Sequence, residues 1–137
     1  LYIEAGRGFE LAGRSAEATA AWRDALRVDP EGEEAALLLG QQALKQRDLA
    51  GALRWFERAA ALKPRRFDAR NNLGILYYQA LRMDEAAREM EAARGLRPAD
   101  AAPWFYLGLI AQKAGELGQA DTLLAAAIVV AFCLIRG

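Results

Sequence analysis

The feature that most constrains this chain is an interval of 34 residues that recurs along its length. Four glycines keep the interval without slippage: Gly6, Gly40, Gly74 and Gly108. Two alanine columns and one proline column share it: Ala18, Ala52, Ala86 and Ala120; Ala25, Ala59, Ala93 and Ala127; Pro30, Pro64 and Pro98. Because four independent columns agree on one period, the sequence predicts an array of structural repeats.

Aligned on the glycines, the array covers residues 1–137, with an incomplete repeat at 1–32, complete repeats at 33–66, 67–100 and 101–134, and an apolar tail. Small and apolar residues recur at steps of three and four, which places them on one face of a helix. Proline cannot continue a helix interior, so each repeat should end at its proline. We therefore expect eight helices joined by short connections into antiparallel pairs. Their predicted ranges are 1–12, 16–28, 33–46, 49–62, 67–80, 83–96, 101–114 and 117–131.

Gly40 stands inside a run of strong helix formers, AALLLGQQAL, although glycine in a helix costs about 1 kcal/mol relative to alanine. The repeat suggests a reason for it. We expect Gly40 and Ala52 to lie where the two helices of a repeat cross, so that the backbones approach closely. Leu39 and Phe56 should then fill the space beside the crossing. The sequence GRGFELAG is not expected to be a nucleotide-binding loop, because no strand precedes it and its glycines are explained by repeat and turn positions.

Composition narrows the function classes. Eighteen basic and eighteen acidic residues cancel, so charge favours neither nucleic acid nor an acidic membrane surface as a partner. The chain has no histidine and a single cysteine, Cys133, so we expect no catalytic site, no metal site and no cofactor. Carboxylates such as Glu85, Glu89 and Glu91, which have arginines beside them, are expected to form ion pairs on helix surfaces.

Few features of the sequence indicate the source organism or the cellular compartment. Arginine supplies fifteen of the eighteen basic residues, which favours a bacterial source. The first residues, LYIEAGRGFE, carry neither an initiating methionine nor a signal pattern, which predicts a piece of a longer or processed chain. The compartment stays open between the cytoplasm and the periplasm of a bacterium, and the cytoplasm is favoured.

The order of residues within each repeat resembles the tetratricopeptide repeat (TPR), in which a large residue, leucine and glycine, an aromatic residue, alanines and a proline follow one another in 34 residues. The matching positions are Trp104, Leu107 and Gly108; Leu73, Gly74 and Tyr77; Leu39, Gly40 and Phe56; and Tyr2, Gly6, Phe9 and Trp22. Phe132 departs from the pattern, because it stands where the last proline is expected. The resemblance implies an all-α fold, a right-handed superhelical α-solenoid of antiparallel helix pairs.

The resemblance also implies a protein-interaction scaffold whose concave groove, lined by the first helix of each repeat, binds a peptide or helix of a partner protein. Carried over position by position, the groove residues are Ile3, Arg7, Leu37, Gln41, Leu44, Asn71, Ile75, Tyr78, Phe105 and Leu109. The wall is largely apolar, which favours a ligand with apolar anchors. It lacks the cationic clamp with which some family members grip a C-terminal carboxylate. The alternative is that some of these residues pack within the array.

The segment least like the family is the end of the chain, LLAAAIVVAFCLIRG. Its thirteen uncharged residues from Leu123 to Ile135 are fewer than the about 20 needed for a membrane span, so we expect no span. They are also too apolar to remain uncovered. Self-association through Val129, Phe132 and Ile135 is one explanation. Packing of the tail against its own last repeat is a second, and a missing capping helix, where the sequence stops within the array, is a third. A second hypothesis for the whole chain is therefore a structural or regulatory arm of a larger protein, which could be an enzyme, that self-associates through this tail.

Overall fold

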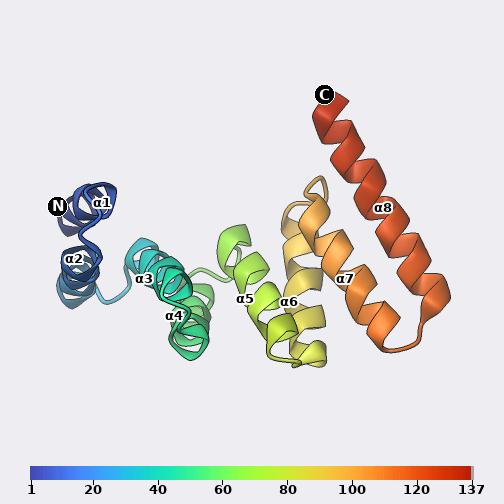
Figure 1. Ribbon diagram of the computed structural model, residues 1–137, viewed down its shortest axis with the longest axis horizontal. Helices are drawn as coiled ribbons and strands as arrows, with labels where there is room; N and C mark the ends of the chain where they lie inside the picture. Colours follow the sequence, from blue (N-terminus) through green and yellow to red (C-terminus); the bar gives the residue numbers. More distant parts are fainter. Residues whose placement is uncertain (137) are drawn as a thin grey trace. The chain divides into compact units, whose positions relative to one another are not determined.

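The computed structural model describes residues 1–136, which form eight α-helices and no strand (Figure 1). The predicted all-α class and its antiparallel helix pairs are confirmed. The first seven helices agree with the predicted ranges to within one residue at each end, whereas the last extends five residues beyond its predicted end. The helices are α1 (Tyr2–Leu11), α2 (Ser15–Val28), α3 (Glu33–Lys45), α4 (Leu49–Leu62), α5 (Phe67–Gln79), α6 (Met83–Leu96), α7 (Ala101–Lys113) and α8 (Leu117–Arg136).

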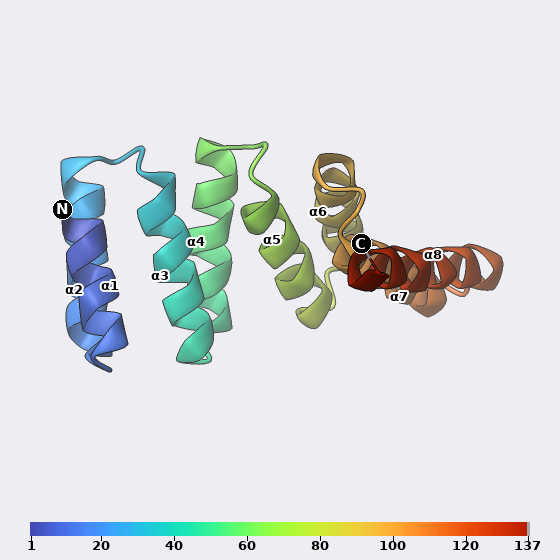
Figure 2. The same ribbon diagram turned by 90° about the horizontal axis from the view of Figure 1, so that it is seen from above.

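The chain divides into two compact units, here called unit 1 (Leu1–Pro64) and unit 2 (from Arg65 onward). In unit 1, α1 packs against α2 and α3 against α4, and α2 also contacts α3, so that the two pairs lie side by side (Figure 2). In unit 2, α5 packs against α6 and α7 against α8, while α7 also contacts both α5 and α6. Each unit therefore contains two helix pairs and one step from a pair to the next.

The core of each unit is centred on the same repeat position. In unit 1 this is Trp22, which is 0% exposed and packs with Leu26 and Leu39. In unit 2 it is Met90, also 0% exposed, which packs with Leu107. Burying one such side chain stabilises the fold by about 1.5 to 3 kcal/mol, so the step between pairs is held chiefly by apolar contacts.

The repeat glycines make room for bulky side chains of the second helix in each pair. A Cβ at Gly40 would lie 2.9 Å from the ring of Phe56, and Phe56 is 0% exposed. Phe56, which we expected beside the crossing, therefore occupies the space over Gly40 itself. The other repeat glycines face the equivalent residues of their own pairs: Gly6 faces Trp22, Gly74 faces Met90 and Gly108 faces Leu124.

The turns inside the four pairs share one backbone geometry. Gly13 and Gly115 have φ angles of 74° and 80°, in the left-handed region that glycine adopts without strain. Arg47 and Leu81 hold the equivalent positions with φ angles of 60° and 62°. For residues with a Cβ, this conformation is unfavourable, so two of the four turns are strained.

The predicted end of α8 is wrong, and Phe132 explains the difference. The other second helices end at Val28, Leu62 and Leu96, each two residues before a proline that lacks the N–H needed to continue the helix. Phe132 supplies that N–H, and α8 continues to Arg136. As a result α8 has 20 residues where α6 has 14, and its end projects past α7 (Figure 1).

Candidate functional site

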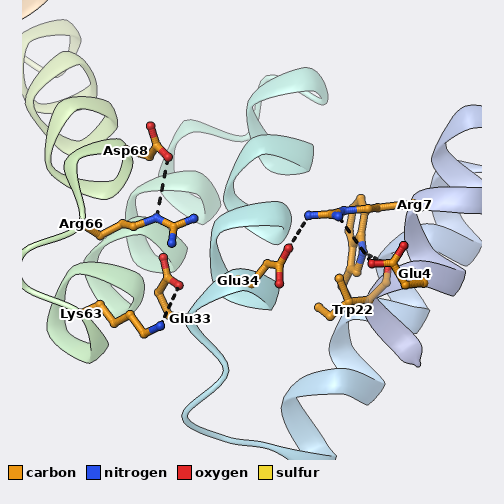
Figure 3. Close-up of polar contacts among 9 residues, drawn as sticks. Glu4, Arg7, Trp22, Glu33, Glu34, Lys63, Arg66 and Asp68 are labelled. Carbon is orange, nitrogen blue, oxygen red and sulfur yellow. Dashed lines mark hydrogen bonds and ion pairs between the residues drawn. The ribbon is translucent and has the colours of Figure 1, made fainter. Parts of the chain in front are cut away.

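In unit 1 the predicted groove residues lie on α1 and α3, and ion pairs link these two helices. Arg7 of α1 pairs with Glu34 of α3 and, at 3.5 Å, with Glu4 of its own helix (Figure 3). Lys45 of α3 pairs with Glu10 of α1. Exposed pairs of this kind contribute about 0.2 to 1 kcal/mol each. The cationic side chains on this face are thus already matched by carboxylates of the same unit.

The predicted exposed wall is wrong for Leu37, which is 4% exposed. Gln41 is exposed, while Ile3 and Leu44 are half-buried, and Ile3 packs against the core of unit 1. Periodicity identified a face of α3, but this helix buries side chains around much of its circumference: Ala35, Ala36, Leu37, Leu39 and Gly40. The alternative of packing within the array therefore holds at Leu37.

In unit 2 the predicted residues of α5 and α7 meet in an aromatic row, defined here as Tyr78, Phe105 and Tyr106. The ring of Tyr106 lies edge-on to Tyr78 and to Phe105, with centroid separations of 5.5 Å in both cases. The ammonium of Lys113 lies 5.6 Å from the centroid of the Tyr78 ring, a cation–π contact. Phe105 is 44% exposed. The row therefore joins α5 to α7 and still presents aromatic surface.

Sequence reasoning did not include Tyr106 in the groove. Tyr106 packs against the core of unit 2, as its repeat equivalent in α3, Leu38, packs against the core of unit 1. Of the remaining predicted residues, Ile75 packs against the core cluster of unit 2 and Leu109 is half-buried. Ile75 therefore behaves mainly as a packing residue, while Leu109 retains some exposure next to the aromatic row.

Asn71 departs from its repeat column. The equivalent positions are held by Ile3, Leu37 and Phe105, all apolar. The side-chain oxygen of Asn71 is buried and has no hydrogen-bond partner in the described part of the chain. An unsatisfied buried polar group costs about 1 to 3 kcal/mol. Folding alone does not account for asparagine at this position.

The carboxylates of α6 form the ion pairs expected from the sequence. Glu85 accepts a hydrogen bond of 2.8 Å from Arg82, and this contact is the main reason why the pKa of the Glu85 carboxyl is lowered. Glu89 pairs with Arg70 of α5 at 2.8 Å. Within residues 1–136 no three histidine, cysteine or acidic side chains converge as they would around a metal ion.

The C-terminal helix leaves most of its apolar surface uncovered. Val129, Phe132 and Ile135 are 59%, 55% and 84% exposed. By length and composition α8 is long and apolar enough to cross a membrane, so the expectation that this segment is too short was wrong once the whole helix is counted. The first half of α8 nevertheless packs into the core of unit 2, since Ala120, Leu123 and Ala127 are buried there. The two ends of the helix therefore have different surroundings.

The chain resembles known proteins both in sequence and in structure. A sequence model of the tetratricopeptide repeat matches residues 4–67, 43–101 and 71–131. No curated protein sequence matches significantly. A crystal structure of MamA matches with a TM-score of 0.89 and 20% identity, covering 99% of this chain and 80% of MamA. YrrB, described as a TPR protein with an unusual peptide-binding site, matches with a TM-score of 0.81 and 24% identity, covering 94% of this chain and 66% of YrrB.

A double mutant of MamA from RS-1 gives a TM-score of 0.85 at 20% identity over 94% of this chain and 72% of that one. Structural likeness at this level of identity shows a shared fold. The family model adds sequence evidence that extends from the first pair of helices into α8. The chain belongs to the tetratricopeptide repeat family.

Proposed function

We propose that this chain is a protein-interaction scaffold that binds a peptide or helix of a partner protein on the α5–α7 face of unit 2. This face is defined here by Asn71, Tyr78, Phe105, Tyr106 and Leu109. Membership of the TPR family supports an interaction role in general, since such repeats present extended binding surfaces. The peptide-binding site described for YrrB supports a peptide or helical ligand.

Asn71 is the observation that carries this proposal. The Asn71 oxygen is buried in the chain without its ligand, so a ligand reaches it only when the side chain turns outward. A peptide backbone then offers it N–H donors at regular intervals. The aromatic row offers an apolar surface against which an apolar side chain of the same ligand can pack. Phe105 is its most suitable anchor, because aromatic residues with free surface dominate binding energies at interfaces.

The experiment compares two variants that each remove an unpartnered buried amide oxygen. Gln42 of α3 is 4% exposed, and its side-chain oxygen also lacks a partner, so Gln42→Leu is the matched control for Asn71→Leu. Both substitutions should raise stability by about 1 kcal/mol, because both remove an unsatisfied polar atom. Only Asn71→Leu should weaken binding.

Partner proteins are first captured with the wild-type chain, and the identified binding segment is then titrated against each variant. A lost hydrogen bond of about 1.4 kcal/mol corresponds to a tenfold weaker affinity for Asn71→Leu. The proposal is wrong if folded Asn71→Leu binds as tightly as the wild type, or if Gln42→Leu weakens binding equally. A chain that retains no partner at all would also contradict it.

A further inference from the structure

Two lysines hold the same place in the repeat but have different partners. Lys45 is the last residue of α3, and Lys113, two repeats later, is the last residue of α7. Each reaches back to the first helix of the preceding pair. Lys45 pairs there with the carboxylate of Glu10, whereas the ammonium of Lys113 lies 5.6 Å from the centroid of the Tyr78 ring. Because Glu10 and Tyr78 are also repeat equivalents, one contact occurs twice, once with a carboxylate and once without.

This difference leaves a positive charge without a counterion on the α5–α7 face. The charged side chains of the two helices are Asp68, Arg70 and Lys113. Asp68 lies 3.7 Å from Arg66, and Arg70 lies 2.8 Å from Glu89. Within residues 1–136, Lys113 forms no ion pair with a carboxylate. An aromatic ring attracts an ammonium through its quadrupole but does not neutralise it, so the charge of Lys113 remains.

The ammonium of Lys113 also lies on the side of α7 where the ligand is proposed to bind. Asp84 and Glu116 line, together with Lys113, a groove at the end of α7 that faces α6 and α8. Neither carboxylate forms an ion pair with Lys113 in the described part of the chain. The exposed lysine instead places its ammonium over Tyr78 of the aromatic row. A ligand packed on this row therefore meets the charge.

We infer that the partner segment carries an aspartate or glutamate beside its apolar anchor, and that this side-chain carboxylate pairs with Lys113. The inference rests on the proposed function, because it names a chemical feature of the segment bound on the α5–α7 face. The incoming carboxylate takes the role that Glu10 has for Lys45. A charge at the edge of an interface acts chiefly on the choice of partner and the rate of association. Lys113 thus selects acidic segments among those with a suitable apolar anchor.

A library of random peptides displayed on phage serves as the probe. The wild type should retain peptides in which an aspartate or glutamate stands close to a large apolar residue. Lys113→Glu reverses the charge and should retain peptides with lysine or arginine at that place instead. Lys45→Gln is the matched control, because it removes the same charge where Glu10 already neutralises it, and it should retain the same peptides as the wild type.

The retained peptides are then synthesised with an amidated C-terminus, so that side chains supply the only carboxylates, and titrated by calorimetry. Lys113→Gln should weaken binding about threefold, as expected for an exposed ion pair. The difference from the wild type should shrink as salt is added, because salt screens exposed charges. Lys45→Gln should leave the affinity unchanged at every salt concentration.

The outcomes separate this inference from the proposed function. Peptides retained without enrichment in acidic residues, or an unchanged affinity for Lys113→Gln, overturn the inference. The proposed function still stands in that case if Phe105→Ala weakens binding of the same peptides. Binding by the free-acid form of a peptide alone assigns the charge to a chain terminus and overturns the inference as well. A wild-type chain that retains no peptide overturns both.

Discussion

Replacing Gly40 with alanine tests the packing of the repeat more sharply than a larger substitution would. In an open helix this change stabilises by about 1 kcal/mol, because alanine has the higher helix propensity. At Gly40 the new Cβ would lie 2.9 to 3.0 Å from three atoms of the Phe56 ring. Since Phe56 is 0% exposed, the ring cannot move into solvent. Overpacking of this kind costs about 1 to 3 kcal/mol.

The two effects oppose each other, and overpacking should win. We expect Gly40→Ala to lower the free energy of unfolding by about 1 kcal/mol net, which for a chain of this size lowers the melting temperature by about 3 to 5 °C. Gly8→Ala is the matched control in the same unit, because a Cβ there meets no atom within 4 Å. It should raise stability by up to about 1 kcal/mol.

The assay is thermal and urea unfolding followed by far-UV circular dichroism. Combining Gly40→Ala with Phe56→Leu should show positive coupling: the double variant should be more stable than the sum of the single effects predicts, because a smaller side chain relieves the clash. The reasoning fails if Gly40→Ala stabilises as much as Gly8→Ala. It also fails if the effects of Gly40→Ala and Phe56→Leu simply add.

Three further outcomes follow from the structure. Leu81→Gly should raise stability by about 1 kcal/mol in urea unfolding, because it relieves a left-handed turn, and a loss of stability would contradict the turn geometry. Phe132→Pro should end α8 near residue 130 and reduce helical circular dichroism accordingly; an unchanged spectrum would refute the explanation of its length. Phe105→Ala should weaken partner binding about thirtyfold, whereas Arg88→Ala, exposed on α6, should not, and equal effects would exclude the α5–α7 face.

The repeat frame made most of the fold predictable. Gly40, Gly74 and Gly108 each make room for a bulky side chain of the second helix in the pair. Pro30 and Pro64 end helices because proline lacks an N–H. These residues therefore mark local structure directly. The end of α8 was missed because the predicted boundary followed the repeat pattern, although Phe132 can continue a helix. Beyond Ala127 no residue of α8 is buried within the described chain, so no buried contact marks this part of the helix in the sequence pattern.

The candidate site was less predictable than the fold. Periodicity places Leu37, Ile75 and Phe105 on related faces of their helices, but burial depends on which neighbouring helix covers each face. Leu37 and Ile75 are covered to different extents, and Phe105 is exposed. The sequence shows Asn71 as a polar residue in an apolar column. Only the three-dimensional packing shows that its oxygen has no partner.

Photo-crosslinking to the captured partner tests the central proposal most directly. A benzophenone amino acid is placed at Leu109 on the α5–α7 face in one variant and at Arg88 on the second helix α6 in another. The proposal predicts a covalent product with the partner from position 109 and none from position 88, with both variants folded and binding. A product from position 88 alone would place recognition on the second helices and contradict the proposed function.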